Sequence, residues 1–493
     1  MEKKPLEEKP RTGRMTGALI YAVCCAAIGS SSQFGYNNGV MNVPKEVIQK
    51  WVNQSSIEKF NSTLTSENSD FIFGWMVSVF CIGGMIGGVF SGPLADHAGR
   101  KGGMLWNNIT ALVGAAILGV AKISGYYFLI FIGRIIVGIN AGISSALAPL
   151  YMVEIAPVNL RGALGTICQL SITFFMCISE ILGIPSILGS DDLWPLLLAI
   201  TFPFAVYQLI AIPFAPESPK YLIASKGNVE KARQVLQKLR DSDDVDDEID
   251  EMQEEVDRMR KESEIKFLDM FRNRELSWPL FIAVMMMLSQ QFSGINAAMY
   301  YSTAIFQGAG LSRDTSTYAT IGLGAINALM TLVSTLLIDR FGRRTLHLIG
   351  MCGMWLTSIC LVACLANSEN KIAAIIAIIC VFLFVISFAT GPGAIPWFYV
   401  SEIFQQNARG HANSIAVVVN WFAAFIVGLI FLPLNNAIGP YSFLVFTGCL
   451  TVCILFTWKF VPETKGKTVD EIVEEFRMKK SLLTTSQSVN SIS

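Results

Sequence analysis

Charged residues are scarce in this chain. Asp, Glu, Lys and Arg make up 15% of the 493 residues, whereas soluble domains contain roughly 25%. Hydrophobic residues make up 52%. The formal net charge of −1 also lacks the excess of basic residues that a nucleic-acid partner would require. This composition argues against a soluble enzyme or a nucleic-acid-binding protein, and it indicates a polytopic membrane protein whose surroundings are lipid.

Patterns that build metal, nucleotide or disulfide sites are also missing from the sequence. It has no HExxH pattern and no CxxC pair, and Lys465–Thr468 lacks the upstream glycine of a phosphate-binding loop. Its 11 cysteines all fall in apolar runs, and its three histidines, His97, His347 and His411, fall at predicted cytoplasmic loop edges. We therefore expect no cofactor, no metal site and no catalytic residue, which disfavours an ATP-driven pump or an intramembrane protease.

Long apolar runs are what the sequence has in abundance. A bilayer core of about 30 Å needs about 20 apolar residues per helix. Twelve runs meet this requirement, and their even number places both termini on one side of the membrane. The runs are 17–38, 71–93, 104–121, 126–150, 163–186, 193–214, 277–300, 316–338, 345–366, 371–398, 413–433 and 439–459.

The lysines and arginines give the orientation of these runs. With the termini inside, the inner loops and tails hold 30 of the 37 basic residues, and the positive-inside rule then makes both termini cytoplasmic. Two glycosylation sequons, at Asn53 and Asn61, fall in the one long outer loop, 39–70. We therefore expect a multi-pass glycoprotein of the plasma membrane, in contact with membrane lipid.

Three charged motifs occur twice, in the same order and about 245 residues apart. Asp96–Lys101 returns as Asp339–Arg344, Glu154 with Arg161 returns as Glu402 with Arg409, and Pro216-Glu217-Ser218 returns as Pro462-Glu463-Thr464. Such repeats indicate two parallel six-helix bundles, an architecture of carriers that bind a solute where the repeats meet. The predicted division is a tail, a first bundle, a linker, a second bundle and a tail, at 1–16, 17–214, 215–276, 277–460 and 461–493.

The linker is expected to contain short surface helices, because Val229–Leu239 and Ile249–Arg260 carry apolar residues at helical spacing. Only two ionisable residues, Arg134 and Glu180, fall deep within the apolar runs. Intramembrane charges are usually paired or functional. We favour an ion pair between the two, and the alternative is that Glu180 is a proton-coupling carboxylate.

Uncharged amides are plentiful in the predicted helices. They offer both donors and acceptors and stay neutral at physiological pH, which suits a neutral polar solute such as a sugar. Trp397 adds an aromatic face beside the flexible segment Gly391–Gly393. Contacts between helices are the alternative role for each amide. The amides in question are Gln169, Gln290, Gln291, Asn296, Asn327 and Asn420.

At these residues the chain resembles the sugar porter branch of the major facilitator superfamily, in particular the animal facilitative hexose transporters. The resemblance extends from about Gln33 to Arg477. It rests on Gln33–Asn37, Asp96–Lys101, Gly133-Arg134, Arg161-Gly162, Pro216–Pro219, Gln290–Asn296, Tyr300–Thr303, Asp339–Arg344, Gly391–Gly393, Asn420-Trp421 and Val461–Gly466.

The resemblance implies an all-α membrane protein with twelve transmembrane helices in two bundles related by pseudo-two-fold symmetry. It also implies roles for individual residues. Tyr300 and Tyr301 resemble the outer gate of the family. The implied hexose contacts are Gln169, Gln290, Gln291, Asn296, Asn327 and Trp397, to which we add Asn420 as a substrate-binding amide. The implied cytoplasmic salt-bridge network is Arg100, Glu154, Arg161 and Glu217, mirrored by Arg343, Glu402, Arg409 and Glu463.

The chain also departs from its apparent family. Proton-coupled members carry an aspartate where this chain has Asn37, which favours downhill uniport. His97 replaces the usual arginine of the first cytoplasmic motif. Ala389 and Ala424 replace a glutamate and an asparagine of glucose-transporting relatives, so galactose, mannose or fructose are candidate substrates beside D-glucose. The sequence thus predicts a facilitative hexose uniporter that works by alternating access, the alternatives being a proton–sugar symporter and a sugar sensor that does not transport.

Overall fold

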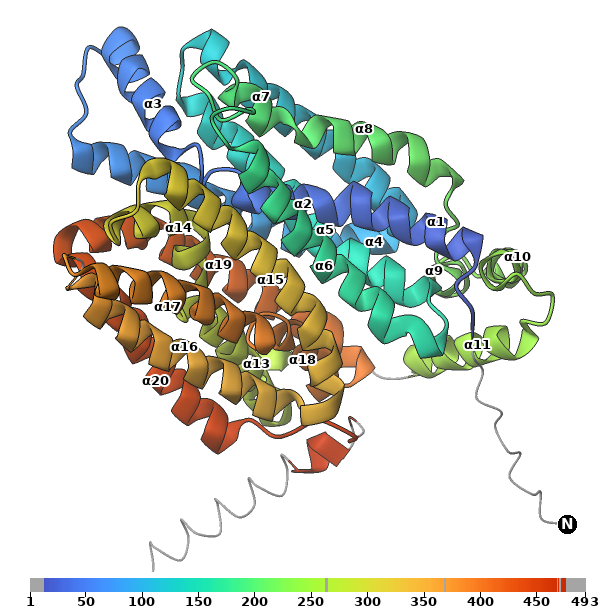
Figure 1. Ribbon diagram of the computed structural model, residues 1–493. Helices are drawn as coiled ribbons and strands as arrows, with labels where there is room; N and C mark the ends of the chain where they lie inside the picture. The colour runs from blue at the N-terminus through green and yellow to red at the C-terminus, as the bar shows by residue number, and fades with distance from the viewer. Residues whose placement is uncertain (1–12, 262–264, 368, 468, 470, 476–493) are drawn as a thin grey trace, which may run out of the picture.

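The computed structural model describes residues 13–261, 265–367, 369–467, 469 and 471–475, and all regular structure within them is helical. The helices form two bundles that lie side by side, one from each half of the chain (Figure 1). The predicted fold class, a major facilitator fold, is confirmed by this arrangement.

The helices of the N-terminal half follow one another through tight connections. A π-helical turn, η1 (Ala27–Ser31), joins the first two, and short 3-10 segments lie at η2 (Val158–Leu160) and η3 (Ile212–Phe214). The α-helices are α1 (Gly17–Ala26), α2 (Ser32–Gly39), α3 (Lys45–Phe60), α4 (Ser66–Ser124), α5 (Phe128–Ile155), α6 (Arg161–Leu182), α7 (Trp194–Ala199) and α8 (Thr201–Ala211).

The linker contributes α9 (Pro219–Ala224), α10 (Val229–Arg240), α11 (Asp246–Lys261) and α12 (Asp269–Arg272). Two of these, α10 and α11, match the helical spacing seen in the sequence. The C-terminal half contains α13 (Arg274–Phe292), α14 (Ile295–Gly308), α15 (Arg313–Phe341), α16 (Arg343–Leu365), α17 (Lys371–Thr390), α18 (Ile395–Ile403), α19 (Gln406–Ile438), η4 (Gly439–Tyr441) and α20 (Ser442–Phe460).

Ten stretches of the described chain are long and apolar enough to cross a membrane. Two of them each contain two of the predicted crossings. Ser66–Ser124 has 59 residues, about 90 Å of helix, and the backbone of Gly99 interrupts it at φ +80°. Asn407–Phe460 has 54 residues and contains α19, η4 and α20. The ten stretches therefore agree with twelve crossings.

Glycines let α4 and α5 pack with their backbones almost touching. A Cβ at Gly83 would overlap the carbonyl oxygen of Ile135, and a Cβ at Gly138 would overlap that of Phe80. Helices in lipid associate through such close backbone packing rather than through the hydrophobic effect. Glycine is required at these positions because any side chain would push the two helices apart.

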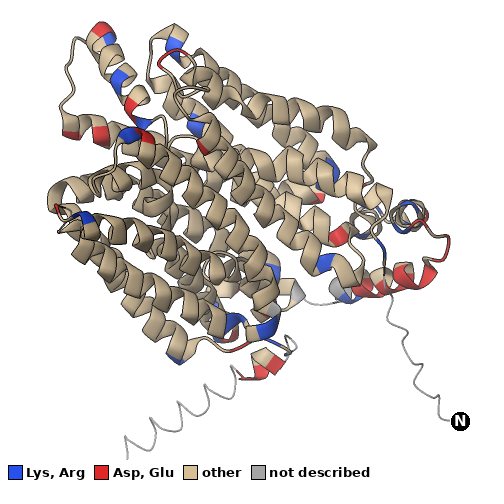
Figure 2. Ribbon diagram, in the orientation of Figure 1, with Lys and Arg blue, Asp and Glu red and all other residues tan. Residues whose placement is uncertain are grey.

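The predicted outer loop 39–70 contains a helix, α3, that the sequence reading did not anticipate. Val47, Ile48 and Val52 are buried against the bundle, while Glu58 and Lys59 are exposed. We call the end of the molecule that carries α3 the far end, and the end that carries α9–α11 the linker end (Figure 1). Charged residues gather at these two ends and are sparse between them (Figure 2).

The two halves are held together at the far end. Asn42 donates to the carbonyl oxygen of Met299 at 2.8 Å and to Ser302 Oγ at 2.7 Å, and Glu46 pairs with Arg313 at 3.1 Å. Four further contacts between helices of the two bundles also lie toward this end. They are Tyr300 with Asn38, Gln307 with Glu46, Asn436 with Asp70 and Cys177 with Ile321.

Adding a methyl group at Gly138 tests the close packing of α4 and α5. We expect Gly138→Ala to lower the free energy of unfolding by about 1–3 kcal/mol, the usual cost of overpacking, and to reduce the yield of folded protein. The measurement is thermal melting of the purified protein in detergent. Gly92→Ala is the matched control, because a Cβ there meets no other atom within 4 Å. Equal melting temperatures for the two variants would contradict the packing argument.

Candidate functional site

Three amides from α13 and α19 form a closed triangle inside the C-terminal bundle. Gln291 Nε2 donates to Gln290 Oε1 at 3.2 Å and to Asn420 Oδ1 at 3.0 Å. Asn420 Nδ2 donates to Gln290 Oε1 at 2.7 Å. All three side chains are buried. The sequence placed Gln290 and Gln291 on one predicted helix and Asn420 on another, and the structure brings all three into direct contact.

Gln290 also fixes the break between α17 and α18. Its Nε2 donates to the carbonyl oxygens of Pro392 and Gly393 at 2.9 and 2.8 Å. These carbonyls lie between the end of α17 and the start of α18, where intrahelical hydrogen bonds are missing. Trp397, in the first turn of α18, is half-buried beside this break. Gln290 therefore positions the segment that carries the predicted aromatic contact.

A second break, between α13 and α14, brings another amide to the triangle. Gly294 has φ +88° there, a conformation that favours glycine. Two residues later, Asn296 donates to Gln291 Oε1 at 2.6 Å. The Oδ1 atom of Asn296 makes no hydrogen bond to a described residue, so it is an acceptor that a ligand could use.

Gln169 on α6 and Asn327 on α15 differ from the triangle in having no partner for their side-chain amides among the described residues. Neither amide is fully enclosed by the described part of the chain. Each therefore has some surface that a solute could reach. By contrast, Gln290 has used both N–H groups and accepts twice. The six amides thus divide into an internally bonded set and an open set, a division that the sequence did not reveal.

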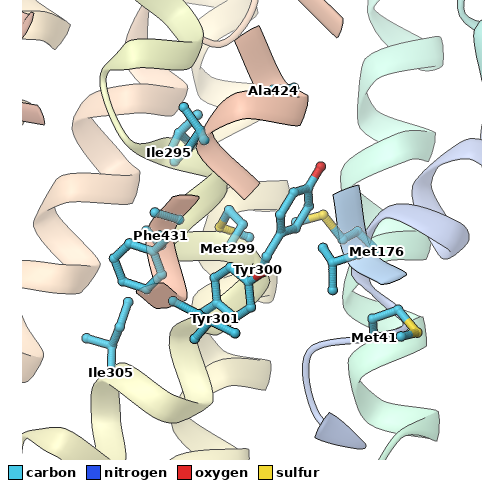
Figure 3. Packing of buried hydrophobic residues seen from close by; sticks show 14 of the residues in the cluster. Met41, Met176, Ile295, Met299, Tyr300, Tyr301, Ile305, Ala424 and Phe431 are labelled. Atoms are coloured by element: carbon cyan, nitrogen blue, oxygen red, sulfur yellow. The ribbon is translucent and has the colours of Figure 1, made fainter. Parts of the chain in front are cut away.

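The two predicted gate tyrosines lie on α14, toward the far end. Tyr300 donates to Asn38 Oδ1 of the N-terminal half at 2.9 Å. Tyr301 donates to the carbonyl oxygen of Gly428 at 2.8 Å and stacks on Phe431, with ring centroids 5.3 Å apart. Figure 3 shows both tyrosines within a packed apolar layer. Tyr300 thus joins the two halves near the far end, and a gate role for both tyrosines stays a prediction.

The predicted ion pair between Arg134 and Glu180 is wrong. Arg134 donates to the carbonyl oxygens of Asn37 at 2.6 Å and of Met76 and Val77 at 3.3 Å each, and its guanidinium lies 4.5 Å from the ring centre of Phe80. Both carboxyl oxygens of Glu180 are buried and have no hydrogen-bond partner in the described chain. Backbone carbonyls of α2 and α4 replace the carboxylate that the sequence offered.

At the linker end, four residues of the N-terminal half form a clamp, named here the first clamp: Arg100, Glu154, Glu217 and Ser218. Arg100 makes two hydrogen bonds of 2.8 Å to Glu154, and Ser218 donates to Glu154 at 2.5 Å. Glu217 Oε1 accepts from the backbone N–H groups of Arg100 and Lys101 at 3.1 Å each. The Glu217 carboxylate occupies the space where a Cβ of Gly99 would be.

The C-terminal half repeats this geometry in a second clamp: Arg343, Glu402, Glu463 and Thr464. Arg343 Nε donates to Glu402 at 2.9 Å, Thr464 donates to Glu402 at 2.5 Å, and Glu463 accepts from the backbone N–H of Arg343 at 2.7 Å. Gly342, with φ +88°, leaves room for the Glu463 carboxylate. Each clamp joins helices within one bundle.

Arg161 and His347 lie away from their predicted surroundings. Arg161 is exposed at the start of α6 and makes no hydrogen bond or ion pair to the first clamp among the described residues. Arg409 donates to the carbonyl oxygen of Phe404 at 3.3 Å. His347 does not lie at a loop edge, because it is buried in α16 with Nε2 at 3.0 Å from Ser289 Oγ. Membership of Arg161 and Arg409 in a network stays a prediction for another state of the molecule.

Comparison with known proteins places this geometry in context. A family model described as "Sugar (and other) transporter" matches residues 22–476. "Facilitated glucose transporter protein 1" of Caenorhabditis elegans is 50% identical over 473 residues, which cover 95% of this chain and 92% of the relative. "Solute carrier family 2, facilitated glucose transporter member 3" of Canis lupus familiaris is 41% identical and covers 94% of both chains.

Solved structures of a bacterial carrier have the same fold. The partially occluded inward-open conformation of the xylose transporter XylE from E. coli matches with a TM-score of 0.78 and 26% sequence identity, over 92% of this chain and 100% of that chain. A second XylE structure, described as a proton:xylose symporter bound to 6-bromo-6-deoxy-D-glucose, has the same TM-score and identity over 94% of this chain.

Two leucine substitutions distinguish the bonded amides from the open ones. Gln290→Leu removes four hydrogen bonds and leaves buried carbonyls unsatisfied. We expect it to lower the free energy of unfolding by about 1–3 kcal/mol for each group left without a partner. Asn327→Leu breaks no side-chain hydrogen bond within the described chain and should leave the melting temperature within the error of the measurement. Similar losses for both variants in thermal melting would show that the division is wrong.

Proposed function

This chain belongs to the sugar transporter family, and from that premise we propose that it is a facilitative carrier of hexoses, D-glucose above all. The observation that carries the proposal is the set of neutral amides around the Gln290 triangle. Amides supply both donors and acceptors to sugar hydroxyls without a charge that would need a counterion. The repeated bundles supply two bodies that can rock about a site between them.

We propose that the open amides make the first contacts with the sugar. Gln169 and Asn327 offer complete amides, and Asn296 offers a free acceptor. Gln290, Gln291 and Asn420 would bind sugar by exchanging some of their mutual hydrogen bonds for bonds to hydroxyl groups, while the ring face of Trp397 packs against the sugar. Ala424 lies in the apolar layer of Figure 3 and offers no hydrogen bond. This leaves room for galactose, mannose or fructose as further substrates.

Uniport fits the surroundings of Asn37. The side-chain Nδ2 of Asn37 donates to the carbonyl oxygen of Gln33 and to Thr201 Oγ1 at 2.9 Å each. The backbone carbonyl oxygen of Asn37 accepts from Arg134. An amide in this position cannot take up or release a proton. Symport driven by Glu180 is the second candidate, favoured by the burial of that carboxyl without a partner.

Orientation follows from the basic residues of the linker end. We propose that the linker end faces the cytoplasm, that both termini are cytoplasmic and that the far end faces the outside of a plasma membrane. The structure described here is then a state closed to the outside. The same orientation exposes α3 and both sequons to the glycosylation machinery.

Flux through purified protein in liposomes tests the proposed function. We expect labelled D-glucose to equilibrate across the membrane, without accumulating, whether or not a proton gradient is imposed. Unlabelled galactose, mannose and fructose added as competitors would rank the substrates. Asn327→Leu, which leaves the fold intact, should raise the half-saturation concentration about two- to tenfold, the effect of losing about one hydrogen bond.

Each alternative function has its own outcome in this assay. Uphill uptake that collapses on addition of a protonophore would establish symport. Saturable binding of labelled glucose without flux, in liposomes that hold folded protein, would establish a sensor.

Glycosylation is expected at one sequon only. Asn61 is exposed just after α3, with φ +50°. In contrast, Asn53 lies within α3 and accepts a hydrogen bond from the N–H of Leu64, and Ser55 of its sequon is buried against Gly125. Asn61→Gln should therefore abolish the mass shift produced by glycosidase treatment of protein from animal cells, whereas Asn53→Gln should retain it. A shift that persists in Asn61→Gln would contradict this assignment.

A further inference from the structure

Glu180 lies on the seam between the two bundles. It is buried on α6, two residues before the helix ends at the far end. Across the seam is Gly324 of α15, where a Cβ would overlap Glu180 Oε2 and would lie 3.3 Å from the backbone of Cys177. The carboxyl group is therefore held against the opposite bundle in the state closed at the far end.

The groups that face this carboxyl carry no charge. Its own helix contributes Cys177, α15 contributes the backbone at Gly324, and the turn after α2 contributes the side chain of Asn42. Arg134, the one basic residue in the interior of this bundle among the described residues, is bound to carbonyl oxygens instead. A carboxylate buried here would lack a counterion, a costly arrangement in a membrane protein.

The hydrogen bonds of Asn42 favour the protonated form of Glu180 over the ionised form. A backbone carbonyl oxygen can only accept a hydrogen bond. The Asn42 side-chain atom that faces the carbonyl oxygen of Met299 must therefore be the amide nitrogen, Nδ2. Its second N–H is directed to Ser302 Oγ. The remaining atom, Asn42 Oδ1, is buried and has no partner in the described chain. Because both N–H groups of Asn42 are directed elsewhere, a protonated Glu180 can donate to Asn42 Oδ1, and this bond would satisfy two orphaned groups at once.

Access to Glu180 differs on its two sides. A pocket of about 90 Å³ opens at the far end and is lined by Asn42, Lys45, Glu46 and Arg313, among other residues. Toward the linker end, Met176 lies one helical turn from Glu180 on α6. It packs into the apolar layer that contains Met41, Met299 and Tyr300 (Figure 3). Water and protons can therefore approach Asn42 from outside, while Met176 and its apolar neighbours lie one turn from Glu180 toward the linker end.

We propose that Glu180 is a one-sided proton latch: the far end closes when Glu180 takes up a proton from the outside and, as a neutral acid, donates a hydrogen bond to Asn42, which in turn binds α14 of the opposite bundle. The latch rests on the proposed function, because it requires the two bundles to separate at the far end during transport. On opening, Asn42 leaves Met299 and Ser302, water reaches Glu180, and the carboxylic acid releases the same proton to the same side. No proton crosses the membrane.

The direction of the pH effect follows from this cycle. The closed form holds one more proton than the open form, so raising the external pH favours the form open to the outside. While that form is a minority, its population rises by up to tenfold per pH unit. The half-saturation concentration for external hexose then falls by up to the same factor, because apparent affinity scales with the fraction of carriers able to bind.

The test is uptake of labelled hexose by cells that express the full chain, at external pH 5.5 to 8.5 and fixed internal pH. In the unmodified protein the half-saturation concentration should fall as external pH rises. Glu180→Gln keeps a neutral hydrogen-bond donor for Asn42. At every pH, this variant should show the half-saturation concentration that the unmodified protein has at the lowest pH. Glu180→Leu removes the donor and should hold it, also independent of pH, at a lower value. The control is Glu58→Gln, which removes an exposed carboxylate on α3. This variant should behave as the unmodified protein.

Three outcomes separate the possibilities. A pH dependence that survives in Glu180→Gln overturns the latch while leaving the proposed function in place. Alkalinisation of the medium on sugar addition that is abolished by Glu180→Gln also overturns it, since that result makes Glu180 a coupling residue. Absence of any flux in the unmodified protein defeats the proposed function itself. Surface expression of each variant, measured by external labelling, separates a transport defect from a folding defect.

Discussion

Every polar group in the hydrocarbon region of a membrane must find its partner within the protein, and most features of this molecule follow from that constraint. Helix breaks are permitted only where side chains satisfy the freed backbone groups, as Gln290 does for Pro392 and Gly393. The guanidinium of Arg134 is tolerated because carbonyl oxygens surround it. Polar side chains are thus confined to a few positions within the bundles. These positions are the helix breaks, the proposed sugar site and the far-end contacts between the bundles.

The two ends of the molecule use their polar groups differently. At the linker end each clamp joins helices of one bundle, so the clamps keep each bundle rigid at the place where the two must move apart. Contacts at the far end, such as Asn42 with Met299, join one bundle to the other. These inter-bundle contacts are single hydrogen bonds and one exposed ion pair, each worth only about 0–1.5 kcal/mol. No single polar contact therefore holds the far end closed.

The sequence predicted the helices well and their contacts less well. Apolar runs and repeated motifs are periodic signals, and they located all twelve crossings and the partners of both clamps. Contacts between distant helices leave no such signal. Arg134 and Glu180 are the two deep charges, and charge balance alone suggests a pair, but the helix rotation that aims Arg134 at carbonyl oxygens cannot be read from spacing. For the same reason the sequence could not separate Gln290, whose hydrogen bonds are filled, from Asn327, whose amide is open.

A buried acid in a carrier is not by itself evidence of coupling, and the surroundings of Glu180 explain why. Coupling requires that one group exchange protons with each side in turn, and that its protonation change the affinity for the solute. Here Glu180 lies two residues before the far-end terminus of α6, and none of the described hydrogen bonds joins it to the amide triangle. The neutral triangle and the isolated acid are therefore compatible in one carrier. Sugar can follow its own gradient while the external proton sets how often the carrier is open to receive it.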